Sequence, residues 1–274
     1  MQYDPIKDKL ATYLSIFTMF RTVFYHILDQ LLLRQRYVKR EIKRYFRDGF
    51  AFYDAGAGFC QYSDFVLKQY PEAEVFACDL KTDYLQSYAA IASERFNYQS
   101  ADLQSYLPSK QYNMAIAVDI LEHIKDDRAA LRNLHRALSD NGILIISTPS
   151  DMDEAAAFTA EHVRPGYNKV ELERKIIDSG FEILSSNFSY GFWGALSWKL
   201  MMKLPLSMYG MHKALCLLWP LYYGIIYLPA QLLMFIDMHI YNPRGTGIIL
   251  VARKITHPPE INESPDIDSS QSGN

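Results

Sequence analysis

The fold of this 274-residue chain is decided by residues 52–60, which read Phe52-Tyr53-Asp54-Ala55-Gly56-Ala57-Gly58-Phe59-Cys60. A short apolar strand leads into a turn with two glycines, and the residues after it predict a helix from about Ser63 to Gln69. Glycines permit a tight turn and let a ligand touch the backbone. The free N–H groups at a helix N-terminus attract an anionic group. The stretch therefore predicts a ligand-binding turn between a strand and a helix.

The glycine turn departs from the pattern of dinucleotide-binding proteins. Their fingerprint is G-x-G-x-x-G, whereas the position three residues after Gly58 is Gln61. The difference argues against NAD or FAD as the ligand. An NAD-dependent oxidoreductase is therefore the less favoured enzymatic alternative.

Acidic residues end three further predicted strands. Asp79 ends the strand 74–79, where a carboxylate can accept hydrogen bonds from ribose hydroxyls. Asp102 ends the strand 97–102, from which a side chain could reach an adenine amino group, and Asp119 ends the strand 112–119. Open α/β sheets bind ligands at the carboxyl ends of their parallel strands, so we expect these acids to face one site.

Strands and helices alternate through most of the chain. Further strands are predicted over 50–54, 143–147, 181–190 and 247–252, and helices over 82–96, 126–138 and 169–179. Short, fully apolar strands that alternate with helices are typical of a parallel sheet covered on both faces. The fold class is therefore predicted to be α/β.

Several motifs, in the family's order, resemble the class I S-adenosylmethionine-dependent methyltransferases. The segment 54–58 is similar to their first motif, D-x-G-x-G-x-G, with Cys60 in place of the third glycine. The others are the ribose-binding acid at Cys78-Asp79-Leu80, the adenine-contacting motif at Ala101-Asp102-Leu103, the fourth-strand signature at 112–124, the fifth strand at 142–149 and a substrate-side loop at 161–164. The resemblance covers about residues 50–190 and 246–254.

The resemblance implies a Rossmann-like, mostly parallel sheet of seven strands, with the last strand antiparallel beside the fifth. It also implies S-adenosylmethionine as the cofactor. The implied cofactor-binding residues are Asp54, Gly56, Ala57, Gly58, Asp79, Leu80, Asp102, Leu103 and Asp119.

The substrate side is less sharply defined by the sequence. His162 follows the fifth strand and is the candidate catalytic base, the alternative being a solvated loop histidine. We expect His123, Arg164 and Tyr167 to lie on the substrate side, although a histidine such as His123 is more often structural and bonded to backbone than catalytic. Asp119, Glu122 and His123 also resemble an E-x-x-E-H metal motif, but its first acid is replaced by Asp and no other ligand is visible. No bound metal is therefore expected.

Two helical segments accompany the predicted domain, which comprises residues 49–191 and 241–254. An N-terminal helical segment covers 1–48, and an apolar helical insertion, 192–240, separates the last two strands. No charged residue occurs from Ala214 to Ile236. The tail, 255–274, is polar and is expected to be disordered.

The insertion has a topological constraint. A single membrane crossing would put the last strand on the opposite side of the membrane from its sheet. We therefore expect a helical hairpin that lies in or dips into one leaflet, beside a basic N-terminal helix. The alternative is that the insertion packs on the N-terminal helices as a second core or a dimer interface.

Composition narrows the class of function. The net charge of −3 gives no reason to expect a nucleic-acid partner, and three cysteines without a pattern argue against a disulfide framework or a zinc site. The N-terminal residues do not read as a secretory signal peptide, so we expect a cytoplasmic protein, peripheral or monotopic at the inner face of a membrane.

The expected reaction is O-methylation of a small hydrophobic acceptor of aromatic, polyene or lipid-like character. A non-catalytic, membrane-associated protein that binds S-adenosylmethionine is the alternative. The oligomeric state stays open.

Overall fold

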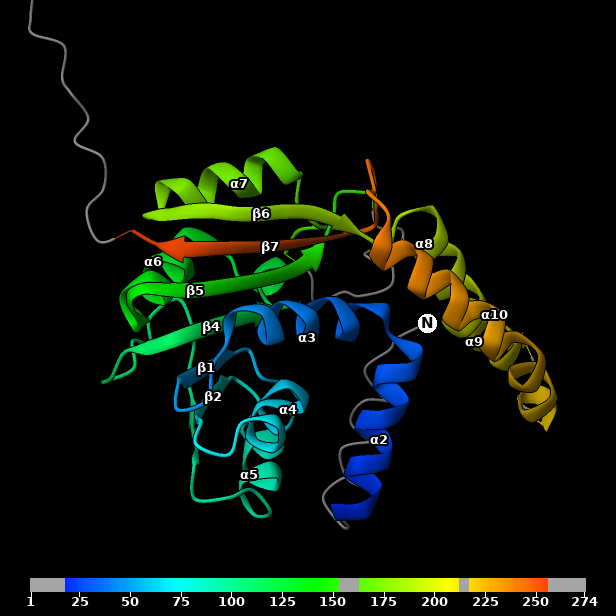
Figure 1. The fold of residues 1–274 in the computed structure, drawn as a ribbon, viewed down its shortest axis with the longest axis horizontal. Coiled ribbons are helices and arrows are strands. Elements are labelled where there is room, and N and C mark those ends of the chain that lie inside the picture. The colour runs from blue at the N-terminus through cyan, green and yellow to red at the C-terminus, as the bar shows by residue number, and fades with distance from the viewer. Residues whose placement is uncertain (1–17, 153–162, 212–216, 256–274) are drawn as a thin grey trace, which may run out of the picture.

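The computed structural model describes residues 18–152, 163–211 and 217–255, in which a seven-stranded sheet has the order β3-β2-β1-β4-β5-β7-β6. The strands are β1 Ala51–Ala55, β2 Glu74–Asp79, β3 Phe96–Ser100, β4 Tyr112–Val118, β5 Leu138–Pro149, β6 Phe181–Ser189 and β7 Gly247–Lys254. Neighbouring strands pair in parallel except around β7, which lies antiparallel between β5 and β6. This arrangement confirms the predicted Rossmann-like sheet with its antiparallel last strand (Figure 1).

The strand order reverses at β1, which has β2 on one side and β4 on the other. Ala55 at the end of β1 pairs with Cys78 of β2 and with Ala117 of β4, so these three strand ends lie level. Gly56, Asp79 and Asp119 follow directly. Ligands of open α/β sheets bind outside the carboxyl ends of the strands at such a reversal.

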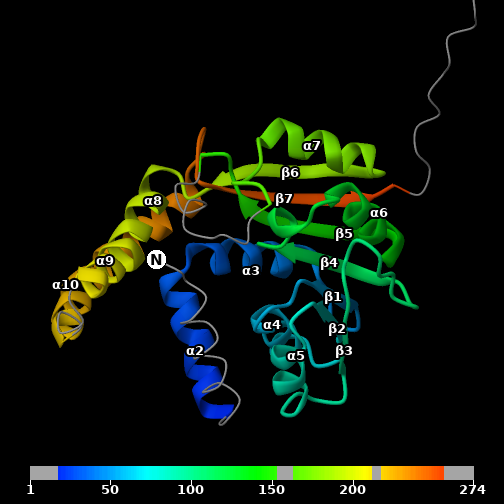
Figure 2. The same ribbon diagram turned by 180° about the vertical axis from the view of Figure 1, so that it is seen from behind.

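Helices cover both faces of the sheet, as the opposite views in Figures 1 and 2 show. The helices α3 (Leu33–Tyr45), α4 (Gln61–Gln69) and α5 (Thr82–Ala89) pack on one face, and α6 (Asp127–Ala137) and α7 (Lys169–Asp178) pack on the other. Successive strand residues point to opposite faces. Phe52 of β1 therefore joins the first core and Tyr53 the second.

Two elements differ in length from the prediction. The fifth strand begins at Leu138 and not at Ile143, because the chain stays paired with β4 through a local irregularity in which Asn141 takes a left-handed conformation. The helix predicted over 82–96 ends at Ala89, since Phe96 already pairs with Val75 in the sheet.

The N-terminal segment forms two helices, α2 (Thr18–Leu31) and α3, which meet at the extended residue Leu32. α3 lies along the sheet and buries Leu33, Val38 and Ile42. α2 runs beside the glycine turn, where Phe24 meets Phe59 edge-to-face at 5.3 Å. The N-terminal helices therefore cover part of the carboxyl edge of the sheet.

The insertion forms an apolar arm, which we define as α8 (Phe192–Trp198), one π-helical turn η3 (Lys199–Lys203), α9 (Leu204–Met211) and α10 (Trp219–His239). Ser189 at the end of β6 pairs with Gly247 at the start of β7, so the arm leaves and re-enters at the carboxyl edge of the sheet. It projects away from the domain (Figures 1 and 2). In the described part of the chain, α10 is the one helix long and apolar enough to cross a membrane.

Candidate functional site

The first glycine of the turn is required by its surroundings. Gly56 has φ +82°, and a Cβ atom built on it would lie 2.6 Å from Ile120, which any side chain would have to displace. The N–H groups of Gly56 and Ala57 donate to the carbonyl of Cys78 at 2.7 and 3.0 Å. The turn is thus fastened to the end of β2.

The second glycine leaves open space. Gly58 has φ +50°, and a Cβ atom there would meet no atom within 4 Å. Cys60 occupies the place of the family's third glycine with φ +59°, the region that glycine adopts without steric cost. Its side chain is fully buried before the first turn of α4. The loop therefore keeps a glycine-like backbone without the third glycine.

Asp79 lies beside this open space. Its two carboxylate oxygens accept hydrogen bonds from the N–H groups of Gly58 and Lys81, each at 2.8 Å. The residue is partly exposed, and Leu80 after it is largely exposed. A carboxylate oxygen has two lone pairs, so each oxygen retains capacity for a further donor such as a ribose hydroxyl.

Asp54 is buried beneath the turn. It is 2% exposed, and one carboxylate oxygen accepts from the hydroxyl of Ser63 at 2.7 Å and from its N–H at 3.2 Å. Burial raises the pKa of the Asp54 carboxyl to about 7, against the lowering effect of these two hydrogen bonds. In this structure the Asp54 side chain fastens α4 to β1, and its cofactor contact stays a prediction.

The third acid of the series, Asp102, does not end a strand as predicted, because β3 ends at Ser100 and Asp102 lies in the loop two residues later. Asp102 accepts from the backbone and side-chain amides of Gln104 at 2.9 to 3.1 Å. Leu103 is buried, and its carbonyl accepts from Asn133 of α6 at 3.0 Å. Both residues lie at the carboxyl edge, where an adenine contact is predicted.

Asp119 has a partner that sequence reasoning missed. Asp119 has φ +49° directly after β4, and its carboxylate forms an ion pair with Arg34 at the start of α3. The Arg34 N–H also donates to the hydroxyl of Tyr190, at 3.1 Å, at the root of the apolar arm. Arg34 thus connects the N-terminal helices and the arm to the predicted cofactor site.

Two of the predicted substrate-side residues belong to a buried polar network. The Tyr167 hydroxyl donates to Asp127 at 2.8 Å, and the Arg164 guanidinium donates to the Leu121 carbonyl at 2.7 Å. Lys175 also donates to Asp127 at 2.8 Å. Burial alone would raise the pKa of Asp127, but hydrogen bonds from Lys175 and Tyr167 lower it overall. The network ties the loop before α7 to α6.

Of the two histidines predicted for the substrate side, the structure describes His123 but not His162. His123 lies in a short 3₁₀ turn after β4, next to buried Glu122, which accepts from Thr148 at 3.1 Å. His162 lies outside the described residues, and its catalytic role stays a prediction. Within the described ranges, no three His, Cys, Asp or Glu side chains gather in a group that could hold a metal ion.

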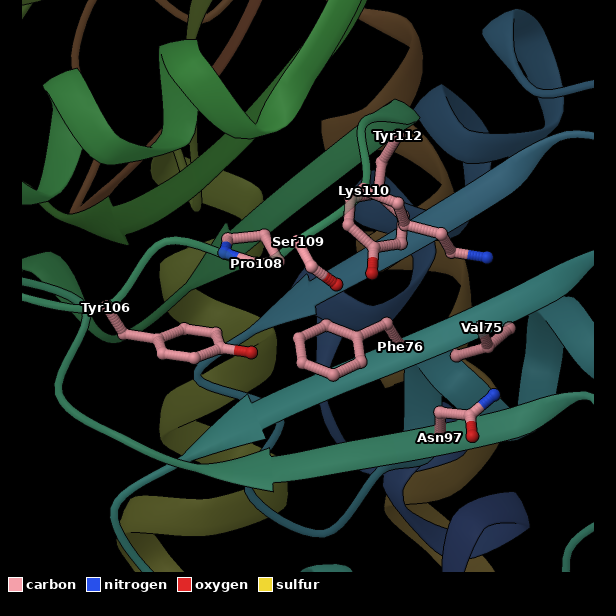
Figure 3. Close-up of a pocket in the computed structure, with 8 residues that line it drawn as sticks. All are labelled: Val75, Phe76, Asn97, Tyr106, Pro108, Ser109, Lys110 and Tyr112. Atoms are coloured by element: carbon pink, nitrogen blue, oxygen red, sulfur yellow. The ribbon is translucent and has the colours of Figure 1, made fainter.

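A separate pocket of about 310 Å³ opens at the amino-terminal half of the sheet. It is lined by Val75 and Phe76 of β2, Asn97 of β3 and the segment from Tyr106 to Tyr112 (Figure 3). The ring of Phe76 stacks near those of Tyr106 and Tyr112. None of its lining residues is a predicted cofactor residue.

The residues present fit S-adenosylmethionine. The open space beside Gly58 leaves the backbone accessible, and the Asp79 carboxylate borders it with acceptor capacity. The arrangement provides N–H groups and a guanidinium for an anionic end and carboxylates for hydroxyl and amino groups.

Comparison with known proteins agrees with this arrangement. Residues 53–144 match the family model of a methyltransferase domain. A ubiquinone biosynthesis O-methyltransferase of Rickettsia canadensis is 26% identical over 126 residues, which cover 40% of this chain and 53% of that protein. A trans-aconitate 2-methyltransferase of an Azoarcus species is 27% identical over 101 residues, covering 37% and 40%. The chain spans about half the length of the curated relatives it matches.

Solved structures share the fold. The [4+2]-cyclase SpnF superposes with a TM-score of 0.54 at 17% identity, covering 80% of each chain. An S-adenosylmethionine-dependent methyltransferase of Mesorhizobium loti gives 0.53 at 17% identity, covering 78% of this chain and 96% of that one. Residues 53–144 are thus similar to a methyltransferase domain, and the seven-stranded sheet has the fold of solved S-adenosylmethionine-dependent methyltransferases.

Proposed function

We propose that the protein transfers a methyl group from S-adenosylmethionine to an oxygen atom of a small hydrophobic acceptor at or near a membrane. The observation that carries the proposal is the fastened glycine turn, with open space at Gly58 and the Asp79 carboxylate beside it. The match of residues 53–144 to a methyltransferase domain supports the same reaction.

When bound, S-adenosylmethionine would supply an electrophilic methyl carbon on a positively charged sulfur, and S-adenosylhomocysteine would be the leaving group of the displacement. The protein has to bind the cofactor and the acceptor, orient them for the reaction, and exclude water from the site. Asp79 would accept hydrogen bonds from the ribose hydroxyls, and Asp102 with Leu103 would contact the adenine. The turn at Gly56, Ala57 and Gly58 would hold the methionine end.

Arg34 is proposed to bind the methionine carboxylate. Guanidinium groups make bidentate, charge-assisted hydrogen bonds with carboxylates, and Arg34 already pairs with Asp119 at the end of β4. Exchange of the Asp119 carboxylate for that of the cofactor would keep the guanidinium neutralised.

The acceptor determines whether a base is needed. The relatives are named for two chemistries, ubiquinone biosynthesis O-methylation and methylation of trans-aconitate. A phenolic hydroxyl must lose its proton, and His162 is the proposed base. A carboxylate acceptor needs none. The apolar arm favours O-methylation of a hydroxyl, because it would bring a hydrophobic acceptor to the carboxyl edge of the sheet.

The test is transfer of a radiolabelled methyl group from S-adenosylmethionine to a total lipid extract, followed by chromatography of the products. We expect labelled product in the organic phase and its strong reduction by His162→Ala. Label confined to a water-soluble product would contradict the hydrophobic acceptor. Unchanged transfer by the variant would contradict the role of His162.

A second candidate is a non-catalytic protein that binds S-adenosylmethionine at a membrane. The observation in its favour is that this fold alone does not fix methyl transfer, since a [4+2]-cyclase shares it. Cofactor binding without methyl transfer to any fraction of the extract would favour this candidate.

A further inference from the structure

We propose that the apolar arm inserts its tip into one leaflet of a phospholipid bilayer, without crossing it, and thereby anchors the protein with the carboxyl edge of its sheet close to the membrane. The inference deepens the proposed function by naming the partner and the way it is engaged. The anchoring itself rests on the arm alone and needs no bound cofactor.

The outer surface of α10 carries a continuous apolar stripe. Large side chains spaced three and four residues apart, on one face of the helix and on the residue that precedes it, are exposed, namely Leu218, Leu221, Ile225, Leu228, Leu232 and Phe235. Across the most apolar 18-residue window of α10, 17% is buried within the protein. A surface of this kind is unfavourable in water and marks an interaction site.

Three tyrosine hydroxyls of the same helix have hydrogen-bond partners within the protein. The hydroxyls of Tyr222 and Tyr223 donate to the carbonyls of Leu200 and Met201 in η3, at 2.7 and 2.8 Å. The Tyr227 hydroxyl donates to the Gln30 side chain at 2.8 Å. In hydrocarbon every polar group needs a partner within the protein. This pattern suits lipid, because hydroxyls beside water would need no such inward partners.

A second copy of this chain is a poorer occupant of the stripe. The three-four spacing would suit a coiled coil, but such pairs carry charged residues beside the seam. The flanking positions on α10 include Gly224, Pro229 and Gln231, and no charge occurs from Ala214 to Ile236. A stripe without flanking charges fits lipid better than a pairing surface exposed to water.

The other end of α10 is clamped to the domain, which excludes a full crossing. Asp237 is fully buried and accepts from the Tyr37 hydroxyl at 2.9 Å and the Gly194 N–H at 2.9 Å. Arg36 of α3 donates to Gln231. We place the boundary of the embedded segment at the Arg36 guanidinium beside Gln231, so the stripe residues Leu232 and Phe235 lie outside the hydrocarbon core.

The length of the free part matches one leaflet. From Leu218 to Leu228 the helix rises about 15 Å, at about 1.5 Å per residue. The hydrocarbon core of a bilayer is about 30 Å thick, so this segment fills about half of it. Phe192, Trp193 and Tyr241 lie exposed at the root of the arm, where aromatic side chains favour the interface.

The experiment is flotation of the full chain with vesicles of phosphatidylcholine and phosphatidylglycerol in equal parts. We expect the wild type to float and the double variant Ile225→Asp/Leu228→Asp to show at least tenfold weaker binding. Ile177→Asp is the matched control, because Ile177 of α7 is exposed to a similar extent, 57% against 64% for Ile225, on another part of the protein. This control should float like the wild type.

The depth to which the arm enters the bilayer is tested with a single new cysteine, Leu217→Cys, in a Cys216→Ser background. A membrane-impermeant maleimide is added outside the vesicles in one experiment and enclosed within them in another. We expect no labelling of the new cysteine from either side until detergent is added. Labelling from within would overturn the one-leaflet arrangement. A wild type that fails to float, or that is a dimer broken by the double variant, would overturn lipid as the partner. None of these measurements uses S-adenosylmethionine, so a separate titration of its binding distinguishes failure of the anchor from failure of the proposed function.

Discussion

Replacing Asp54 by asparagine should make the stability of the domain less dependent on pH. The Asp54 carboxyl is fully buried under the glycine turn and accepts both of its hydrogen bonds from Ser63. An asparagine oxygen can accept the same two hydrogen bonds without carrying a charge. The substitution therefore removes the ionisation and keeps the geometry.

The magnitude follows from the pKa. Burial raises the pKa of Asp54 from 3.8 to about 7, so the folded state holds a proton that the unfolded state has lost. The stabilisation from this group is complete below about pH 4 and is lost as the pH rises towards 7. At about 1.4 kcal/mol for each tenfold change in the equilibrium, the full effect is about 4 kcal/mol, of which about 2 to 3 kcal/mol falls between pH 5 and 8.

The assay is urea unfolding of the wild type and Asp54→Asn at pH 5 and at pH 8. We expect the variant to gain about 2 to 3 kcal/mol relative to the wild type on going from pH 5 to pH 8. Asp83→Asn, at an exposed position on α5, is the control for the amide substitution itself. A difference between wild type and Asp54→Asn that is the same at both pH values would refute the reasoning.

Four further substitutions test other parts of the structure by urea and thermal unfolding. Gly56→Ala should lower the free energy of unfolding by about 2 to 3 kcal/mol, because its Cβ would lie 2.6 Å from Ile120. Gly58→Ala should lower it by about 1 kcal/mol, because its Cβ would meet no atom within 4 Å. Equal losses from the two substitutions would contradict this difference. Asp127→Asn should cost about 3 kcal/mol at pH 7. Because the pKa of Asp127 is lowered, the stability that its carboxylate contributes is present above pH 4 and is lost as the pH falls further. A stability difference between wild type and Asp127→Asn that persists at pH 2 would contradict this role of the carboxylate. Tyr37→Phe should cost about 2 kcal/mol, because the buried Asp237 carboxylate loses the hydroxyl donor to one of its oxygens and keeps the Gly194 N–H on the other. An unchanged midpoint would show that the clamp on α10 does not depend on this hydrogen bond.

Much of the fold could be predicted because its signals are local. The strand ends at Asp79 and Asp119 and the turn at Gly56 each depend on a few neighbouring residues, and the motif order supplied the position of β7. The positions of these side chains at one edge then follow from parallel pairing. Helix and strand ends such as those of α5 and β5 were less predictable, since tertiary pairing decides them.

Contacts between distant segments could not be predicted in the same way. Arg34 is one of seven cations between residues 34 and 47, and nothing in that run distinguishes it from Arg36 or Arg40. The fold alone brings it to Asp119. Arg164 was predicted by its place in a loop motif, but the carbonyls and carboxylate around it become visible only when α6 and α7 are packed.

The buried end of α10 had a faint sequence signal. Asp237 is the first charged residue after the uncharged run that ends at Ile236. A lone acid at this position could have marked the end of the apolar surface, but its partners Tyr37 and Gly194 lie far away in the chain.

The central claim is that the carboxyl edge at Asp79 binds S-adenosylmethionine, and calorimetric titration tests it most directly. Two charge-assisted hydrogen bonds from ribose hydroxyls, at about 1.5 to 3 kcal/mol each, correspond to a loss of more than about 100-fold in affinity when the carboxylate is removed. We predict saturable binding by the wild type and at least that loss in Asp79→Ala, with wild-type affinity retained by the exposed control Asp178→Ala. Binding by Asp79→Ala with unchanged affinity would contradict the account.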